Sequence, residues 1–486
     1  MTQPHDRSWL ASADRRSPWE QVRVTVAGLG LAGFAAADAL QHLGAAVTVV
    51  ADSTDEWSRE KATLLEILGV EVRLGGDPRS DLPGDLDLVV MSPGIPPGAP
   101  LPAEAARRGL LVWGDVELAW RLRDPANMTP WLCVTGTNGK TTTVQMLEAI
   151  LRADGLRAVA AGNVGLPMCE VVMDPEPFDV LAVELSSHQL HWASTVSAHS
   201  ATVLNVAPDH LSWHGDVASY TAAKAKVYER CQVSAVYNHD EPTSRRLVEE
   251  AEVIEGCRAI GFTLGIPSVG MIGLVDGAIA DRAFIEGRDR NAAELARVTD
   301  VSTGAPHNVA NALAAAALAR SVGVTPDGVR RGLQGFELDS HRIAEVGNLH
   351  GVRYVDDSKA TNPHAALASL QAFDTVVWVA GGLAKGARFD ELVEASASRL
   401  RGVVLLGVDR GLISAALSRH ASDVPVIEVS DTDTGVMERV VRAAASLAQA
   451  GDTVLLAPAC ASQDLFADYA ARGDAFAAAV TSLRER

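Results

Sequence analysis

The stretch 136–142, Gly-Thr-Asn-Gly-Lys-Thr-Thr, constrains this chain more than any other sequence feature. It lies between an apolar run predicted as a strand, Trp131 to Val134, and a predicted helix that begins near Thr142. A glycine-rich turn between a strand and a helix directs backbone N–H groups at phosphate oxygens. The spacing departs from G-x-x-x-x-G-K-[ST], because only two residues separate the glycines. We interpret the stretch as a phosphate loop. A chance Gly-Lys-Thr turn is the alternative.

In such a loop the lysine reaches the terminal phosphates of a nucleotide and the hydroxyl that follows it can ligate Mg²⁺. Lys140 and Thr141 occupy these two positions. The predicted phosphate-binding residues are Gly136, Thr137, Asn138, Gly139, Lys140, Thr141 and Thr142.

A second phosphate-binding pattern occurs near the N-terminus. Gly28, Gly30 and Gly33 form G-x-G-x-x-G directly after a predicted strand, and Asp52 ends the next strand. This geometry suits any nucleotide diphosphate, and a tight turn without a ligand is the alternative. Because a hydride-transfer enzyme needs one nucleotide, two such turns predict two nucleotide-like ligands.

The rest of the chain predicts an α/β fold in three domains. Apolar runs of strand length alternate with Ala/Leu-rich helical stretches, which is typical of mainly parallel sheets. We expect a Rossmann-like N-terminal domain, a central P-loop ATPase domain and a Rossmann-like C-terminal domain. Residues 264–279 are predicted to form a hairpin. The predicted bounds are 1–20 for a loosely packed N-terminal extension, then 21–124, 125–338 and 339–486 for the domains.

Composition narrows the class of partner. A formal charge of -19 disfavours nucleic acid and anionic membrane surfaces. The five cysteines form no C-x-x-C pair, and the apolar stretches are too short to span a bilayer. We therefore expect a cytoplasmic protein without membrane insertion, and a monomer.

Polar residues follow the strands beyond the loop. Glu184 ends one predicted strand, His210 comes shortly after another, and Lys224 lies in a predicted helix. The carboxyl ends of such strands are where α/β sheets place ligands. Taken singly, each has an ordinary alternative: a solvated carboxylate, a surface histidine and an exposed helical lysine.

Together these residues resemble the Mur ligase family, which also includes the folylpolyglutamate synthases. The motifs are GTNGKTT, ELSSHQL, NVAPDH followed by YTAAKAKVY, HNVAN and HR. The boxes DSKATNP (357–363) and PACAS (458–462) look like those of the family member that adds D-glutamate. The resemblance covers nearly the whole chain after residue 20.

The resemblance implies the ligands and the roles of the domains. The first domain would bind a UDP-sugar, the central one ATP, and the last one the amino acid. The substrates would be UDP-N-acetylmuramoyl-L-alanine and D-glutamate, joined through an acyl phosphate in peptidoglycan precursor synthesis. ATP and two Mg²⁺ ions would take part, and Lys224 would be carbamylated.

The resemblance also implies residue roles. Lys140, Asn163, His210 and Lys224 would be catalytic, and Thr141, Glu184, His210 and carbamylated Lys224 would hold metal. Besides the loop, the residues that would contact ATP are Asn308, Arg342 and Asp357. The alternatives are that Asn163 is an ordinary turn asparagine and that Arg342 is an ordinary surface arginine. The implied substrate-binding residues are Leu31, Ala32, Asp52, Ser53, Ser92, Pro93, Gly94, Asn163, Ser186, Lys359, Thr361, Lys385, Ser462 and Tyr469.

Three other functions fit parts of the sequence. Another amide ligase, adding a different amino acid or extending folate, is disfavoured by the DSKATN box. An NAD-dependent oxidoreductase is favoured by Gly28 to Gly33 and Asp52 alone. A P-loop binding module without chemistry would bind ATP but release no phosphate.

Overall fold

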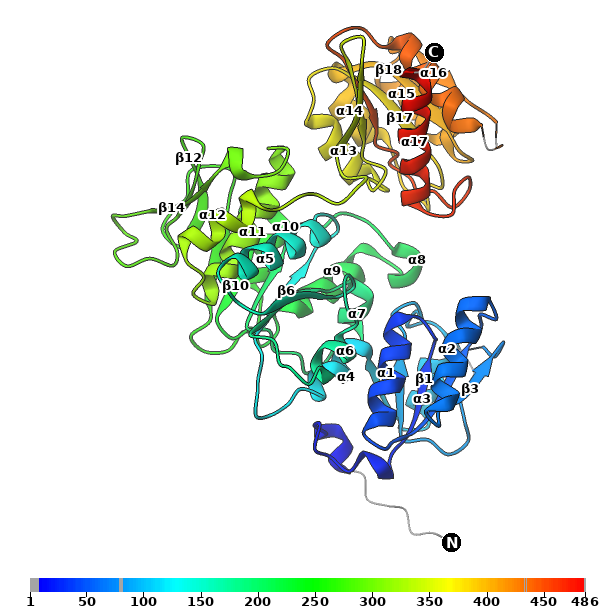
Figure 1. Cartoon of the computed structure of the whole chain (residues 1–486), viewed down its shortest axis with the longest axis vertical. Coiled ribbons are helices and arrows are strands. Elements are labelled where there is room, and N and C mark those ends of the chain that lie inside the picture. The colour runs from blue at the N-terminus through cyan, green and yellow to red at the C-terminus, as the bar shows by residue number, and fades with distance from the viewer. Residues whose placement is uncertain (1–7, 78–81, 432, 434, 485–486) are drawn as a thin grey trace. The chain divides into compact units, whose positions relative to one another are not determined.

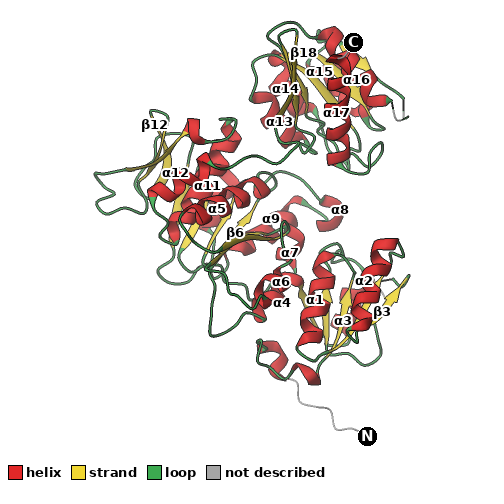
Figure 2. Ribbon diagram, viewed as in Figure 1, coloured by secondary structure: helices red, strands yellow, loops and turns green. Residues whose placement is uncertain are grey.

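The computed structural model describes residues 8–77, 82–431, 433 and 435–484. The chain forms two compact units, one of Met1–Val301 and Asn308–Phe336, the other of Ser302–His307 and Glu337–Arg486. Two sheets belong to the first unit and one to the second. Helices and strands alternate along the chain (Figures 1 and 2), which confirms the predicted α/β class with mainly parallel sheets. The bounds of the three predicted domains stay a prediction.

The first sheet is wholly parallel, with the strand order β3-β2-β1-β4-β5. The chain moves outward in one direction from β1 and then returns to β4 on its other side, so the space between these two strand ends is a topological switch point. The elements are β1 Arg23–Ala27, α1 Leu31–His42, β2 Ala46–Ala51, α2 Glu56–Ile67, β3 Glu71–Leu74, β4 Leu88–Met91, α3 Pro100–Arg107, β5 Leu111–Gly114 and α4 Asp115–Arg121.

The second sheet has the order β14-β13-β12-β11-β10-β9-β6-β8-β7, with β6 between β9 and β8. Every residue of β6 is buried, as expected for a parallel strand covered on both faces. The elements are β6 Trp131–Thr135, α5 Lys140–Ala153, β7 Ala158–Gly162, α6 Met168–Met173, β8 Val180–Glu184, α7 Ser187–His191, β9 Ser200–Val203, α8 Leu211–His214, α9 Val217–Ala225, β10 Ser234–Asn238, α10 Pro242–Glu249, β11 Arg258–Phe262, β12 Met271–Val275, β13 Ala278–Asp281, β14 Ala293–Arg297, α11 Pro306–Ser321 and α12 Pro326–Gln334. The predicted hairpin is present as the antiparallel pair β12 and β13.

The third sheet has the order β15-β16-β20-β17-β18-β19, and only the β15–β16 pair is antiparallel. Its inner strands β17 and β20 are buried throughout. The elements are β15 Ala344–Leu349, β16 Val352–Asp356, α13 Pro363–Gln371, β17 Val376–Gly381, α14 Asp390–Ser396, β18 Leu400–Leu406, α15 Arg410–His420, β19 Val426–Glu428, α16 Val436–Leu447, β20 Thr453–Leu456 and α17 Tyr469–Arg484.

The residues before β1 are packed rather than loose, which corrects the sequence prediction for residues 8–20; residues 1–7 lie outside the described part. Trp19 is buried, packs edge-to-face on Trp113, and donates its indole N–H to the Asp14 carbonyl. Leu10 and Ala13 join the same core. Trp19 is buried and its indole N–H is hydrogen-bonded, which explains why the residues around it are packed.

The two sheets of the first unit are joined through α4 and the segment that begins at α7. The Glu117 carboxylate accepts hydrogen bonds from the backbone N–H groups of Ser194 and Thr195, each at 2.8 Å. Asp115 accepts from the Gln189 side chain at 3.0 Å, and its second carboxylate oxygen has no hydrogen-bond partner among the described residues. A buried carboxylate that is only half satisfied is costly when ionised, and burial raises the pKa of Asp115 to about 6.

The raised pKa of Asp115 predicts a pH-dependent stability. Asp115 binds its proton more tightly in the folded chain than in the unfolded chain. Its contribution to the free energy of unfolding is therefore largest below pH 4 and is lost as the pH rises to about 6. Between pH 4 and 7 the free energy of unfolding of the wild type should fall by on the order of 3 kcal/mol relative to Asp115→Asn. Denaturant titrations at several pH values measure it.

Asp276→Asn is the control, because Asp276 is exposed in the β12–β13 turn and asparagine tolerates its positive φ of 48°. If the free energy of unfolding of Asp115→Asn varied with pH as it does in the wild type and in Asp276→Asn, the burial of Asp115 would not be the cause of the pH dependence.

Candidate active site

The predicted phosphate loop connects β6 to α5 at the carboxyl edge of the second sheet. The helix begins at Lys140, two residues earlier than the sequence suggested, because Gly139 adopts a left-handed φ of 83° and ends the turn sooner. Thr141 and Thr142 therefore lie in the first helical turn, whose free N–H groups form a natural anion site. A Cβ at Gly139 would lie 2.4 Å from the Asn311 side-chain oxygen, so α11 lies directly behind the loop.

The loop is held in place by the segment that follows β9. The Asn138 N–H donates to the Asn205 side chain at 2.9 Å, and the Asn205 amide donates back to the Asn138 carbonyl at 3.1 Å. The Thr137 hydroxyl lies 3.0 Å from the Tyr220 hydroxyl and 3.1 Å from the Ala207 carbonyl oxygen. These bonds fix the loop from the segment that follows β9 and from α9.

Two lysine amines converge on one carbonyl of this loop. Lys140 donates to the carbonyl oxygen of Gly136 at 3.1 Å and to that of Thr137 at 2.9 Å, while Lys224 donates to the Gly136 oxygen at 2.7 Å. Lys224 is 1% exposed. Burial, followed by repulsion from Lys140, holds the pKa of Lys224 well below its usual range, although Asp209 and Glu184 oppose the shift. The Lys224 amine is thereby shifted toward its neutral form.

Glu184 supplies a buried carboxylate at the same edge. It is the last residue of β8 and 1% exposed, and its Oε1 accepts from the Asn163 side chain at 2.7 Å. Its Oε2 has no hydrogen-bond partner among the described residues. Asn163 itself follows β7 and donates its backbone N–H to the Glu184 carbonyl. A buried carboxylate oxygen left unpaired suits a hard cation.

The donor set fits Mg²⁺ only when a ligand completes it. In the part of the chain that the structure describes, no three His, Cys, Asp or Glu side chains are grouped to hold a metal ion. Mg²⁺ usually takes one or two protein oxygens together with substrate phosphates and water. Glu184 and Thr141 beside a phosphate loop match that pattern, and an unmodified Lys224 does not.

His210 lies in a histidine-rich cluster beside the loop. It precedes α8 with a left-handed φ of 52°, and its ring packs 4.7 Å from that of His188. Burial is the main cause that lowers the pKa of His188 to about 3 and that of His214 to about 4. Sequence reasoning missed His188 and His214. The spacing of four residues between His210 and His214, one turn of helix, was the available signal.

Ser186 caps the short helix α7. Its hydroxyl accepts from the Gln189 N–H at 3.1 Å, and the Gln189 side chain accepts from the Ser186 N–H, which forms a capping box. The same Gln189 side chain bonds Asp115, so α7 connects the site edge to the first sheet.

The residues predicted for the UDP-sugar lie around the switch point of the first sheet. Leu31 and Ala32 begin α1, and the segment 92–94 follows β4, which is adjacent to β1. A Cβ at Gly28 would lie 2.7 Å from that of Ser92, so the glycine turn and this segment are in direct contact. Asp52 follows β2 rather than ending it, and both Asp52 and Leu31 are exposed. The predicted residues of this group are Leu31, Ala32, Asp52, Ser53, Ser92, Pro93 and Gly94.

The second unit brings the residues predicted for the amino acid together. The Lys359 amine lies 3.7 Å from the centroid of the Tyr469 ring. Backbone bonds between Leu383 and Ala461 join the loop that carries Lys385 to the loop that carries Ser462. The Ser462 hydroxyl is buried without a hydrogen-bond partner among the described residues. Thr361 precedes α13, its N–H donating to the Lys359 carbonyl at 2.8 Å.

The further ATP contacts divide between the units. Asn308 lies in α11 of the first unit, and Arg342 and Asp357 lie in the second, so their joint role stays a prediction. Asp357 is buried and accepts from the Ser369 hydroxyl. Burial raises its pKa to about 6.

Sequence reasoning missed Arg472, a buried arginine of α17. It is 1% exposed and donates to the Ser358 hydroxyl and carbonyl, both at 2.9 Å, and to the Cys460 carbonyl at 3.1 Å. It therefore joins the DSKATNP box to the PACAS box. No sequence pattern separates it from other helical arginines.

The fold and this site define a phosphate-loop α/β protein whose ATPase-like sheet is accompanied by two Rossmann-like sheets. The Mur ligase middle domain model matches residues 134–319, and the Mur ligase glutamate ligase domain model matches residues 341–460. The chain belongs to the Mur ligase family.

Individual relatives resemble it over nearly their whole length. The chain is 60% identical over 465 residues to the UDP-N-acetylmuramoylalanine--D-glutamate ligase of Streptomyces avermitilis, covering 96% of this chain and 99% of the relative. It is 47% identical to the enzyme of the same name from Mycolicibacterium smegmatis, over 94% and 96% of the two chains.

Solved structures share the fold at low sequence identity. A pseudomurein peptide ligase type C from Methanothermus fervidus matches with a TM-score of 0.58 and 17% identity, over 95% of this chain and 100% of that one. The UDP-N-acetylmuramate-alanine ligase of Thermotoga maritima matches with a TM-score of 0.56 and 18% identity, over 95% and 99%.

The loop geometry predicts that Gly139→Ala weakens nucleotide binding. Alanine at a left-handed φ costs about 1–2 kcal/mol, and its Cβ must also displace Asn311. We expect the affinity for an ATP analogue to fall by at least roughly tenfold, measured by fluorescence titration.

Gly155→Ala is the matched control. Gly155 ends the same helix with a φ of 92° but has open space around it, so this variant should lose stability and keep nucleotide affinity. Equal nucleotide affinity in the two variants would show that the loop does not require glycine there.

Proposed function

We propose that this chain is an ATP-dependent ligase that adds D-glutamate to UDP-N-acetylmuramoyl-L-alanine, in peptidoglycan precursor biosynthesis. The observation that carries the proposal is the convergence of the phosphate loop, Glu184 and Lys224 on one sheet edge. Relatives up to 60% identical bear this enzyme's name, and they support the choice of both substrates. The cytoplasm is the expected compartment, because ATP and nucleotide-linked sugars are found there. Among the described residues, no helix is long and apolar enough to cross a membrane.

The reaction begins with transfer of the ATP γ-phosphate. A carboxylate oxygen of the substrate's L-alanine attacks the phosphorus, the bond to the β-phosphate oxygen breaks, and ADP leaves. Lys140 stabilises charge on the transferring group, and the N–H groups of the first turn of α5 stabilise the remaining phosphates. Asn163, fixed by Glu184, is positioned to orient the acceptor carboxylate.

The second step forms the amide. The uncharged amine of D-glutamate attacks the acyl phosphate carbon, and the tetrahedral intermediate collapses with loss of phosphate and one proton. The two carboxylates of D-glutamate would be bound by Lys385, Thr361, Ser462 and Lys359. Arg472 connects the loop that carries Lys359 and Thr361 to the loop that carries Ser462. A dry site protects the acyl phosphate from hydrolysis.

Two Mg²⁺ ions would be held by Thr141, Glu184, His210 and a carbamylated Lys224, and they would neutralise phosphate charge. Carbamylation agrees with the surroundings of Lys224. A neutral amine reacts with CO₂, and the carbamate would replace a second cation beside Lys140 with an anion. ATP, the metals and the monomeric state remain parts of the proposal.

A substrate panel tests the proposed reaction most broadly. With UDP-N-acetylmuramoyl-L-alanine and ATP, phosphate release should require D-glutamate and stay near background with L-glutamate, L-alanine or meso-diaminopimelate. Lys140→Met should lose activity by at least roughly 10³-fold, because transition-state charge loses its nearest cation. Coupled ADP detection measures both.

Two results would contradict the proposal: turnover with another amino acid in place of D-glutamate, or near-normal turnover by Lys140→Met. Titration with NADH and with the UDP-sugar separately distinguishes the oxidoreductase alternative, which requires NADH binding.

The carbamate predicts a requirement for CO₂. Activity should fall in CO₂-free buffer and return with bicarbonate, and Lys224→Met should be inactive at all bicarbonate concentrations. Lys224→Glu should retain part of the activity without responding to bicarbonate, because its carboxylate resembles the carbamate. Initial rates across a bicarbonate series measure this.

Lys226→Met is the control. Lys226 is two residues away and donates to the His191 and Ala193 carbonyls outside the loop, so this variant should still respond to bicarbonate. Full activity of the wild type without CO₂ would exclude a functional carbamate.

A further inference from the structure

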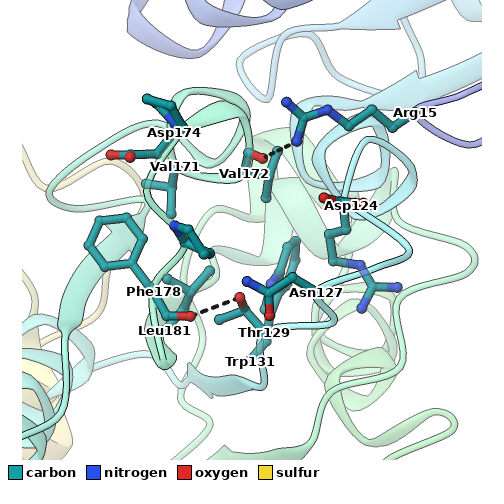
Figure 3. Close-up of a pocket in the computed structure, with 13 residues that line it drawn as sticks. Arg15, Asp124, Asn127, Thr129, Trp131, Val171, Val172, Asp174, Phe178 and Leu181 are labelled. Carbon is teal, nitrogen blue, oxygen red and sulfur yellow. Dashed lines mark hydrogen bonds between the residues drawn. The ribbon is translucent and has the colours of Figure 1, made fainter.

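A cavity of about 180 Å³ lies at the edge of the second sheet opposite the phosphate loop. Its floor includes Trp131, the first residue of β6, whereas the loop follows the last residue of that strand. Figure 3 shows Arg15 and Asp124 on one side of the cavity and Phe178 and Asp174 on the other. No role proposed above uses this cavity.

Aromatic and aliphatic side chains form part of the cavity wall. Trp131, Val171, Phe178 and Leu181 line it, and the Thr129 hydroxyl is already used, donating to the Phe178 carbonyl at 2.9 Å. Aromatic and aliphatic walls of this kind favour a ligand with a planar apolar body.

A half-buried cation lines the same cavity. The Arg123 guanidinium stacks on the Trp120 ring with 3.0 Å to its centroid and donates to the Trp120 carbonyl at 2.8 Å. No carboxylate among the described residues forms an ion pair with Arg123. The two acids at the cavity, Asp124 and Asp174, pair with Arg16 and Arg157, each at 3.6 Å. Burial alone lowers the pKa of Arg123 to about 10.

A second donor is unsatisfied at this site. Trp131 is 1% exposed, and its indole N–H has no hydrogen-bond partner among the described residues. Trp131 lines the cavity, but its indole nitrogen has almost no accessible surface, so this unpaired donor lies behind the cavity wall. Arg15 adds a guanidinium at the rim, where it donates to the Val172 carbonyl at 3.3 Å and keeps further donors.

We propose that this cavity binds a small carboxylate with a planar apolar body, its anion held by the guanidinium groups of Arg123 and Arg15. Arg15 closes the rim, which gives the N-terminal extension a role in the site. A chain of net charge -19 attracts such anions only where cations are concentrated locally. Because β6 separates the cavity from the phosphate loop, the ligand and ATP bind independently.

Titration of the full chain with phenylacetate, benzoate and the uncharged amide phenylacetamide tests this. Ligand-observed NMR should show saturable binding of at least one carboxylate, with the amide roughly tenfold weaker or undetectable. Arg123→Met should weaken the carboxylate by roughly tenfold, and a saturating ATP analogue should leave its affinity unchanged.

Arg258→Met is the matched control. Arg258 also stacks on an aromatic ring, that of Phe284 at 5.1 Å, and donates to a backbone carbonyl, but it lies outside the cavity. If Arg123→Met does not fold, Arg15→Met is the variant used instead, and NMR follows the indole N–H resonance of Trp131. Carboxylate binding should shift that resonance and should weaken in Arg15→Met.

Three results would overturn the proposal: no saturable carboxylate binding up to about 10 mM, unchanged affinity in a folded Arg123→Met, or displacement of the carboxylate by the ATP analogue. Each can occur while the ligase activity itself is intact.

Discussion

Two lysine amines, one of them buried, donate to the carbonyl of Gly136, and the rest of the site is arranged around this crowding of positive charge. The turn at Gly139 places Lys140 at the first position of α5. Lys224 reaches the same point from α9, and there its charge is opposed by both burial and Lys140. In the proposed reaction, a bound phosphate and a carbamate on Lys224 would compensate this charge. Glu184, on the neighbouring strand, is buried with one unpaired oxygen and would supply the negative charge that the proposed metal needs.

Buried charged groups at a distance hold the site residues in place. Glu117 and Asp115 bind the segment that runs from α7 into the loop before β9, so the first sheet and the ATP-binding edge share a structural link. In the second unit, Arg472 joins the two boxes that would bind the amino acid. Each of these groups is buried and hydrogen-bonded across elements, so truncation would leave other polar groups unpaired and would move the loops.

Much of this could be predicted from the sequence, because strand and helix periodicity and the glycine turns are local. The α/β class, the hairpin and the position of Glu184 at a strand end followed from such patterns. The burial of Lys224 and its approach to Gly136 could not be predicted, because they depend on residues 88 positions apart. Arg472 looks like any helical arginine, and the ordered extension depends on Trp19 meeting Trp113. The α5 start was misplaced because a left-handed Gly139 ends the turn early.

The central claim is that residues 136–142 hold a triphosphate whose terminal group passes to a carboxylate. The most direct test uses UDP-N-acetylmuramoyl-L-alanine labelled with ¹⁸O in its alanine carboxylate, with ATP and D-glutamate. Mass spectrometry of the phosphate released should show one ¹⁸O atom in each molecule, because the acyl oxygen leaves with phosphorus when the amide forms. Unlabelled phosphate formed together with the amide would show that no acyl phosphate is made.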